Sequence, residues 1–462
     1  MQALARHANA PALLTRDGQT VSHSRLRRNI GILAQRMAAV GLAPGDRMIA
    51  QVDNRDLQIM ARFAALLLGA EVVMAPDASG FLASGGTVDW SLVFPGQSPG
   101  PGRPITFSPN WFADDAPAPP EDWPGGGGMI FGSSGSTGLQ KFMLASDSVL
   151  ASWQRRARTA IGPDFGNRLL GIPAFSVFGL IYLSKALIEG HAAMGTMGDT
   201  VATMVAARNF DVRELVGTPL ILNDVTEAAE AGHPMPAFAR FLFGGAIADN
   251  QTLARTAAAF AGAHLDVVVG SSEYSISTLG RVQERAIPLG WVGWPVPDTE
   301  LRLDSAGAYT GYPAAAGRLS IRVPEDSRVT GYLNGAPAFD PEGWFDTGDI
   351  ATIASDGSLV IHGREDFLIN LGGIKTTPES IEALCLAHPG VAQVAATRIP
   401  GQAHDRLGLL VAVGPGFDAD RLRAALAARL DLALAIEVRE VEALPRLPTG
   451  KIDRAAVARL FA

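Results

Sequence analysis

Alternating helical and strand-like patterns near the N-terminus constrain the fold of this chain most. Over residues 22–40, apolar residues recur every three or four positions, which predicts a helix that ends at Gly41. Residues 47–52 then predict a strand, 57–68 a helix and 71–75 a second strand. A strand–helix–strand order implies parallel strands covered by helices. We therefore expect an α/β fold with doubly wound sheets in a large N-terminal domain.

The pattern continues and then changes along the chain. Residues 98–128 are rich in Pro and Gly and predict a surface connection. Further α/β alternation is expected through residues 169–172, 181–189, 220–222 and 267–269. After Asp349, short strands at 351–353 and 359–362 precede a helix at 379–386, strands at 391–397 and 408–413, and a helix at 420–430. This C-terminal part predicts a small mobile α+β domain of about 100 residues, a usual domain size. We place the domains at residues 1–363 and 364–462.

Composition excludes several classes of protein. The chain has 462 residues, of which 47% are hydrophobic and 18% charged, so it can bury a large core. Its net charge of −8 and its lack of a basic block argue against nonspecific nucleic-acid binding. Cys385 is the only cysteine, which excludes an internal disulfide and a cysteine-based zinc site. The longest apolar run, 63–75, is interrupted by Glu71 and is too short to span a bilayer, so we expect a soluble cytoplasmic protein.

A glycine- and hydroxyl-rich segment at residues 131–141 is the strongest candidate binding site. It reads F-G-S-S-G-S-T-G-L-Q-K and contains no carboxylate. Backbone N–H groups, hydroxyls and Lys141 can surround an anion, and a polyphosphate is the obvious ligand. The spacing differs from the Walker pattern because two residues separate Gly138 from the lysine and no Ser or Thr follows it. The alternative is a flexible Gly/Ser linker, but the apolar, strand-like residues 129–131 lead directly into the loop.

Four further motifs contain candidate functional side chains. Val269-Gly-Ser-Ser-Glu273 ends an apolar strand with a carboxylate that suits Mg²⁺, and its alternative is a solvated loop glutamate. Gly343-Trp-Phe-Asp-Thr-Gly-Asp349 is an acidic segment that could accept ribose hydroxyls or form an ordinary turn. Gly363-Arg-Glu-Asp366 precedes Asn370-Leu-Gly-Gly-Ile-Lys375, and Leu447-Pro-Thr-Gly-Lys-Ile-Asp453 presents a lysine in a Pro/Gly turn. Such lysines are usually solvated, so the order of the five motifs is what favours function.

Together these motifs resemble the adenylate-forming superfamily, the AMP-binding enzymes that include acyl- and aryl-CoA synthetases, adenylation domains and luciferases. The resemblance runs from about residue 13 to 457. It implies that a carboxylate attacks the α-phosphate of ATP to give acyl-AMP and pyrophosphate, and that a thiol then attacks the acyl carbon. Two anions must meet in the first step, so positive charge and donors are needed around the phosphates.

The resemblance also implies roles for individual residues. It implies catalytic roles for Lys451, Glu273 and Ser272. It also implies that Glu273 and Thr137 bind Mg²⁺. Nucleotide contacts are implied for Ser133, Ser134, Gly135, Ser136, Thr137, Gly138, Lys141, Gly245, Ala246, Val269, Gly270, Ser271, Asp349, Arg364 and Lys375. Asp366 would be the hinge about which the small domain rotates between the two half-reactions. The acid pocket would include Ser176, Gly244 and Val268.

Departures from the family pattern and the choice of acceptor leave alternatives open. Gln140 stands where the family usually has a proline, and Val269 stands where it commonly has an aromatic residue that stacks on adenine. Ser176 stands where acyl- and aryl-CoA ligases often have a histidine. The small or apolar pocket residues favour an aryl, alicyclic or medium acyl acid. The acceptor is expected to be CoA, with the phosphopantetheine of a carrier protein or an amine as alternatives. A non-catalytic relative that binds a nucleotide or acyl ligand is the alternative from another class. We expect no nucleic-acid partner, and the resemblance leaves a homodimer open.

Overall fold

Two large sheets form the N-terminal part of the protein. The computed structural model describes residues 1–15, 18–113, 123–133, 141–282, 287–304, 312–313, 315–371, 374–401, 405–430, 436–447 and 451–462, with only the backbone for 374–375 and 429–430. Within these residues, the first sheet has the strand order β6-β5-β3-β4-β7-β8. Its strands are β3 (Arg47–Ala50), β4 (Glu71–Met74), β5 (Trp90–Val93), β6 (Arg103–Thr106), β7 (Gly128–Ser133) and β8 (Lys141–Ser146). All neighbours are parallel except β7 and β8, which form an antiparallel hairpin.

The second sheet carries most of the candidate site. Its order is β15-β14-β13-β12-β11-β9-β10-β1-β2, and the run from β13 to β1 is parallel. Its strands are β1 (Pro11–Leu14), β2 (Thr20–Ser22), β9 (Asn167–Leu170), β10 (Ala193–Gly195), β11 (Val212–Gly217), β12 (Arg240–Gly244), β13 (His264–Ser271), β14 (Ser275–Val282) and β15 (Trp294–Pro295). Because parallel strands end at the same edge, the residues that follow β9, β11, β12 and β13 meet there.

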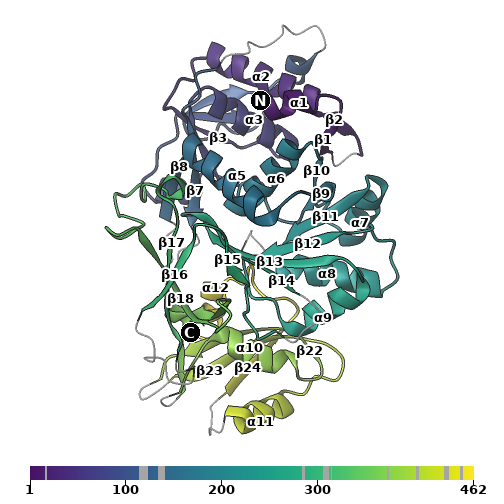
Figure 1. The fold of residues 1–462 in the computed structure, drawn as a ribbon, viewed down its shortest axis with the longest axis vertical. Coiled ribbons are helices and arrows are strands. Elements are labelled where there is room, and N and C mark those ends of the chain that lie inside the picture. The colour runs from purple at the N-terminus through teal and green to yellow at the C-terminus, as the bar shows by residue number, and fades with distance from the viewer. Residues whose placement is uncertain are drawn as a thin grey trace.

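Helices cover both sheets and confirm the predicted α/β class (Figure 1). In the described part of the N-terminal region they are α1 (Gln2–Arg6), α2 (His23–Ala39), α3 (Arg55–Leu67), α4 (Ser79–Ala83), α5 (Asp147–Ile161), α6 (Val177–Glu189), α7 (Thr200–Asn209), α8 (Pro219–Glu230) and α9 (Asn250–Ala259), with 3₁₀ turns η1 (Pro109–Phe112) and η2 (Glu325–Ser327). The predicted helices at 22–40 and 57–68 are α2 and α3, which pack against each other. Side-chain oxygens of Ser22 and Asn54 cap them, which explains where they begin.

The structure completes one expectation about local structure and corrects another. Residues 220–222, expected within the α/β alternation, lie in α8, because Pro219 occupies the first helical turn where a missing N–H is harmless. The Pro/Gly-rich stretch 98–128 is more than a connection, because it contributes β6 to the edge of the first sheet. Ile105 and Phe107 from this stretch are buried in the core. Composition identified the turns but not the short strand between them.

A third sheet leads to the C-terminal domain at the bottom of Figure 1. It contains β16 (Glu300–Asp304), β17 (Gly317–Arg322), β18 (Trp344–Ile353) and β19 (Leu359–Arg364), in that order. The acidic segment that ends at Asp349 therefore lies within strand β18 instead of forming a separate turn. Gly348, at φ +72°, gives this strand its local irregularity.

The C-terminal part has its own core. After η3 (Glu365–Phe367) come β20 (Ile369–Leu371), β21 (Ile374–Thr376), α10 (Pro378–Leu386), β22 (Val391–Ile399), β23 (Arg406–Val413), α11 (Ala419–Leu430), β24 (Ile436–Val441) and α12 (Arg454–Leu460). Apolar side chains up to Ile361 join the core of the large domain, whereas those from Ile369 onward form separate clusters. These clusters support the proposed division at 363/364.

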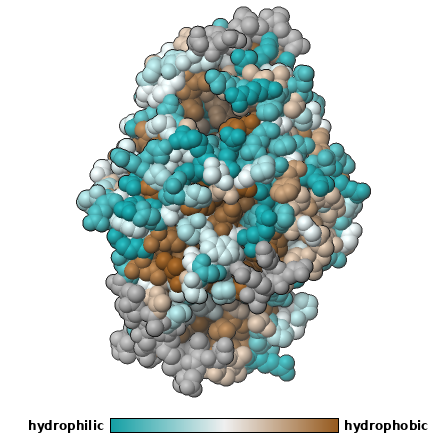
Figure 2. Space-filling view, viewed as in Figure 1, coloured by the Kyte–Doolittle hydropathy of each residue, from teal (hydrophilic) through white to brown (hydrophobic). Residues whose placement is uncertain are grey.

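The surface is mixed in polarity. On the face shown in Figure 2, apolar patches (brown) lie between bands of polar residues (teal), which is usual for globular proteins. In the part of the chain that the structure describes, we find no helix with the length and hydropathy needed to cross a membrane.

Candidate active site

A large cleft lies between the carboxyl edge of the second sheet and the C-terminal domain. Its volume is about 1880 Å³. The structure brings the following sequence-predicted residues to its wall: Ser133, Lys141, Ser176, Gly244, Gly245, Ala246, Val268, Val269, Gly270, Ser271, Ser272, Glu273, Asp349, Arg364, Asp366 and Lys451. Residues from five distant motifs therefore share one cavity.

The structure describes only the two ends of the predicted phosphate loop. Ser133 closes β7 and Lys141 opens β8, and the two residues are paired across the hairpin. The predicted contacts Ser134, Gly135, Ser136, Thr137 and Gly138, together with Gln140, lie outside the described residues, as does the side chain of Lys375. The hairpin thus fixes where the loop leaves and re-enters the sheet.

Glu273 is a buried carboxylate of the cleft, with only 4% of its surface exposed. One carboxylate oxygen accepts a hydrogen bond from the Tyr332 hydroxyl at 2.9 Å, and the other accepts one from the Ser271 hydroxyl. Burial beside Glu273 raises the pKa of Tyr332, so this hydroxyl stays protonated and donates. The ring of Tyr332 lies 5.1 Å from the Lys141 Nζ, a cation–π distance. Tyr332 therefore links the predicted metal ligand to the end of the phosphate loop.

Tyr332 was missed by the sequence reasoning. The backbone of its segment is fixed by a bridge between Tyr332 and Met143 and by a hydrogen bond from the Leu333 N–H to the Phe142 carbonyl at 2.7 Å. These contacts join positions about 190 residues apart in sequence. A tyrosine beside a glycine is too common a local signal to have revealed them.

Asp349 interacts electrostatically with two cations, Arg364 and Lys451. It pairs with Arg364 across β18 and β19, and Lys451 also attracts its charge. Burial nevertheless raises the pKa of the Asp349 carboxyl to about 6, against the opposing effects of Arg364, Thr347 and Lys451. The carboxylate is therefore held with its charge poorly solvated and ready to accept hydrogen bonds.

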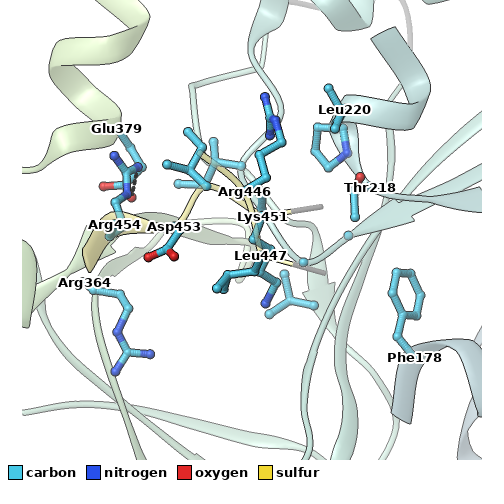
Figure 3. A pocket seen from close by; sticks show the side chains of 18 of the residues that line it. Phe178, Thr218, Leu220, Arg364, Glu379, Arg446, Leu447, Lys451, Asp453 and Arg454 are labelled. Carbon is cyan, nitrogen blue, oxygen red and sulfur yellow. Dashed lines mark hydrogen bonds and ion pairs between the residues drawn. The ribbon is translucent and has the colours of Figure 1, made fainter. Parts of the chain in front are cut away.

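Lys451 reaches the sheet edge from the C-terminal domain, as Figure 3 shows. The Leu447 N–H donates to the Lys451 carbonyl at 2.8 Å. A Cβ added to Gly245 would stand 3.2 Å from the Lys451 Cε. Burial lowers the pKa of the Lys451 ammonium, Asp349 opposes that effect and Arg364 adds to it. The lysine is thus brought, partly desolvated, to the end of β12.

An ion-pair network anchors the lysine turn within its own domain. Arg454, three residues after Lys451, contacts Glu382 and donates to Glu379 on α10 at 2.9 Å. Asp453 accepts from the Ala456 N–H at 2.9 Å and so caps α12. The residues that directly follow Lys451 are therefore held by polar contacts.

Two predicted pocket residues have clear structural roles. The Ser176 hydroxyl donates to the Pro173 carbonyl at 2.8 Å and accepts from the Gly179 N–H at 3.0 Å, which caps α6. A Cβ on Gly244 would stand 2.3 Å from the Val268 carbonyl oxygen of the neighbouring strand. Both residues line the cleft, but the Ser176 hydroxyl is committed to its helix.

The residues present fit Mg²⁺ bound together with a polyphosphate. Mg²⁺ prefers oxygen ligands and commonly takes one or two protein carboxylates besides phosphate oxygens and water. Each oxygen of Glu273 receives one hydrogen bond in the described structure and keeps further acceptor capacity. Glu273 would hold the ion, whose charge would neutralise phosphate oxygens.

Comparison with known proteins places the chain in a family. It is 29% identical over 338 residues to a salicylyl-CoA synthase / salicylate adenylyltransferase from Streptomyces sp, covering 70% of this chain and 61% of that protein. It is 29% identical over 360 residues to a probable 2-succinylbenzoate–CoA ligase from Mycobacterium tuberculosis (strain CDC 1551 / Oshkosh), covering 72% of this chain and 84% of that protein. The chain thus spans less than two thirds of the first relative and more of the second.

Structural comparison gives the same fold. The structure of the amide bond synthetase McbA from Marinactinospora thermotolerans superposes with a TM-score of 0.82 at 20% identity, covering 100% of this chain and 98% of that one. The family model described as AMP-binding enzyme matches residues 92–333, more than half of the 462 residues. The chain therefore belongs to the AMP-binding enzyme family.

Proposed function

We propose that the protein is an ATP-dependent acid–thiol ligase that activates a small carboxylic acid as its acyl-adenylate and transfers the acyl group to CoA. One observation carries this proposal: Lys451 from the C-terminal domain lies against Gly245 in the same cleft as Asp349 and Glu273. In this proposal a carboxylate and an α-phosphate would meet beside Lys451, whose charge would favour their encounter. The two relatives described above, whose names specify CoA ligation of aryl acids, also support it.

In the first half-reaction, a carboxylate oxygen of the acid attacks the α-phosphorus of ATP. The bond from the α-phosphorus to the bridging oxygen breaks, and its electron pair leaves with pyrophosphate. Lys451 would offset the charge that grows between the acid and the α-phosphate, aided by the Ser272 hydroxyl. Asp349 would accept hydrogen bonds from the ribose hydroxyls beside Arg364. Ser133, Lys141 and the loop between them would hold the leaving pyrophosphate.

In the second half-reaction, the sulfur of a thiol attacks the acyl carbon. The carbon–oxygen bond to AMP breaks, AMP leaves with the electron pair, and the thiol proton is released. The thiol needs a path to the acyl carbon, which would lie beside Lys451. Rotation of residues 364–462 about Asp366 would withdraw Lys451 and open that path. Asp366 lies in the short turn η3 between the two separate cores, a suitable place for a hinge.

ATP–pyrophosphate exchange across a panel of carboxylic acids tests the first step. We expect exchange with at least one aryl or medium acyl acid, and a loss on the order of 10²–10³ in Lys451→Ala, the usual effect of removing one transition-state contact. Arg421→Ala, at an exposed side chain of α11, is the control and should retain the wild-type rate. No exchange with any acid, or full exchange in Lys451→Ala, would refute the proposal.

The acceptor requires a separate measurement. Incubating the pre-formed acyl-adenylate complex with CoA, with a phosphopantetheinylated carrier protein and with an amine distinguishes the three acceptors. Thioester formed with free CoA supports the proposal. Product formed only with the carrier protein, or only with the amine, would show that this molecule, and not CoA, is the acceptor.

A further inference from the structure

The start of helix α10 lies against the end of strand β19, across the proposed division between the two domains. His362 is one of the last residues of β19 before that division, and Thr377 is the N-cap residue of α10. The Thr377 hydroxyl donates to the His362 carbonyl at 2.6 Å. Because Thr377 is fully buried, solvent does not compete for its hydroxyl in this arrangement.

A glycine at the end of β19 makes room for the helix. A Cβ added to Gly363 would stand 2.5 Å from the Glu379 Oε2 and 2.7 Å from the Thr377 Cβ and Cγ2, closer than Cβ atoms come to other atoms in proteins. The helix therefore approaches the strand only because residue 363 has no side chain. We call these interactions of His362 and Gly363 with Thr377 and Glu379 the α10–β19 contact.

The first turn of α10 is also linked to the lysine turn. Arg454 donates to the Glu379 carboxylate at 2.9 Å and pairs with Glu382 three residues later. Figure 3 shows Arg454 and Glu379 side by side. Since Arg454 follows Lys451 by three residues, a path of direct contacts runs from β19 through Glu379 and Arg454 to the segment that carries the lysine.

The α10–β19 contact belongs to one arrangement of the two domains. His362 precedes the proposed hinge residue Asp366, whereas Thr377 follows it. Rotation of residues 364–462 about Asp366 would move Thr377 relative to His362, and a hydrogen bond depends steeply on both distance and angle. The arrangement with Lys451 in the cleft therefore has a stabilising contact that the rotated arrangement would lack.

We infer that Thr377 and Glu379 are positioning residues that dock the C-terminal domain on β19 for acyl-adenylate formation. The inference rests on the proposed function and names a contact that controls its two half-reactions. The α10–β19 contact favours the first step, because it keeps Lys451 at the end of β12. It opposes the second step, because it breaks before the thiol reaches the acyl carbon. Its strength thus sets the ratio of the two rates.

Thr377→Val tests the hydrogen bond, because valine keeps the shape of the side chain and lacks the hydroxyl. Two rates are measured: thioester formation from CoA and the synthetic adenylate of the most active acid in the exchange panel, and pyrophosphate exchange with that acid. We expect the ratio of the first rate to the second to rise about 5-fold or more, the usual effect of one lost hydrogen bond. Thr377→Ser retains the hydroxyl and should keep the wild-type ratio.

Ser380→Ala is the matched control for Thr377→Val. The Ser380 hydroxyl lies 3.0 Å from the Thr377 hydroxyl, but both residues belong to the C-terminal domain. A purely structural role of this helix start would lower both rates together in either variant. An unchanged ratio in Thr377→Val, or an equal rise in Ser380→Ala, would overturn the inference.

Gly363→Ala tests the steric part of the same contact. Its methyl group would push α10 away from β19, so the ratio of the two rates should rise at least as much as in Thr377→Val. Gly357→Ala is the control, since Gly357 precedes β19 at φ +81° with nothing within 4 Å of an added Cβ. Equal ratios in the two alanine variants would contradict the inference.

A distance measurement separates this inference from the proposed function. Spin labels on Ala258→Cys in α9 and Ala424→Cys in α11 report how the domains are arranged, because both positions are exposed and Cys385 is buried. In the presence of α,β-methylene-ATP, Thr377→Val should show a second distance that wild type and Thr377→Ser lack.

The two proposals then fail in different ways. The second distance in Thr377→Val, with no pyrophosphate exchange by wild type on any acid, would support the α10–β19 contact and refute the ligase. The same distances in wild type and Thr377→Val, with normal exchange, would support the ligase and overturn the inference.

Discussion

The Lys451 side chain lies against Gly245, so that a methyl group on the glycine would stand 3.2 Å from the lysine Cε. The two residues are more than 200 positions apart and come from different domains. Gly245 also has φ +83°, a conformation that glycine adopts readily and other residues adopt at a cost. The missing side chain of Gly245 therefore leaves room for the lysine.

Gly245→Ala should therefore slow acyl-adenylate formation. The added methyl group would displace the lysine by a few tenths of an ångström, and the positive φ would add strain of about 1 kcal/mol. We expect a fall of about 10-fold or more in pyrophosphate exchange. Gly262→Ala is the control, since Gly262 has φ +87° with nothing within 4 Å of its added Cβ. Equal activity of the two alanine variants would show that strain, and not displacement of Lys451, accounts for the effect.

Asp349 makes stability depend on pH in the nucleotide-free protein. Its pKa of about 6 in the folded state lies above the ordinary value of 3.8. The folded state therefore binds the proton more tightly, and the stability this gives is present below pH 3.8 and is lost as pH rises through 6. Asp349→Asn should raise the free energy of unfolding at pH 8 by roughly 2–3 kcal/mol. The gain should shrink as pH falls from 6 toward 4 in denaturant titrations.

Asp346, in the same strand, has a pKa that is shifted in the opposite direction, so Asp346→Asn is the matched comparison. Burial tends to raise the pKa of Asp346, but hydrogen bonds from Arg318 and the Gly348 N–H outweigh it and lower the pKa. Removing this carboxylate should give no stabilisation at pH 8. A similar gain in both variants would mean that total negative charge, and not the burial of Asp349, sets the pH dependence.

Tyr332→Phe should weaken the binding of Mg²⁺ by the enzyme. The substitution removes the hydroxyl that donates to Glu273 at 2.9 Å and retains the ring that faces Lys141. Loss of a hydrogen bond to a buried carboxylate is worth about 1–3 kcal/mol, so the Mg²⁺ concentration for half-maximal exchange should rise about 5-fold or more. Metal titrations of exchange and of ATP-analogue binding measure this. Tyr332→Leu, which also removes the ring, should cost more in affinity for ATP, and equal metal titration curves for wild type and Tyr332→Phe would exclude the positioning role.

Arg454→Met should destabilise the C-terminal domain. It leaves Glu379 and Glu382 close together and largely buried without their shared cation, and their mutual repulsion raises the pKa of Glu379 further. Breaking a buried ion pair from one side typically costs 3–5 kcal/mol. Arg423→Met removes the partner of the exposed Asp420 and should cost less than about 1 kcal/mol. Comparable thermal unfolding of the two variants would show that the Arg454 network does not anchor the lysine turn.

The sequence by itself determined the fold class, the helices α2 and α3, and the five motifs that share the cleft. These follow from local periodicity, capping residues and turn chemistry, which act over a few neighbouring positions. Residues 220–222 show the limit of local patterns, because a short apolar run does not distinguish a strand from a buried helix start.

Only the tertiary structure decided which side chains meet. The contact of Lys451 with Gly245, the Tyr332–Glu273 hydrogen bond and the raised pKa of Asp349 each depend on residues that are far apart in sequence. It also showed that the Ser176 hydroxyl caps a helix whereas the Thr218 hydroxyl does not. Burial and long-range contact arise from packing of whole sheets and domains, and so no local pattern in the chain contains them.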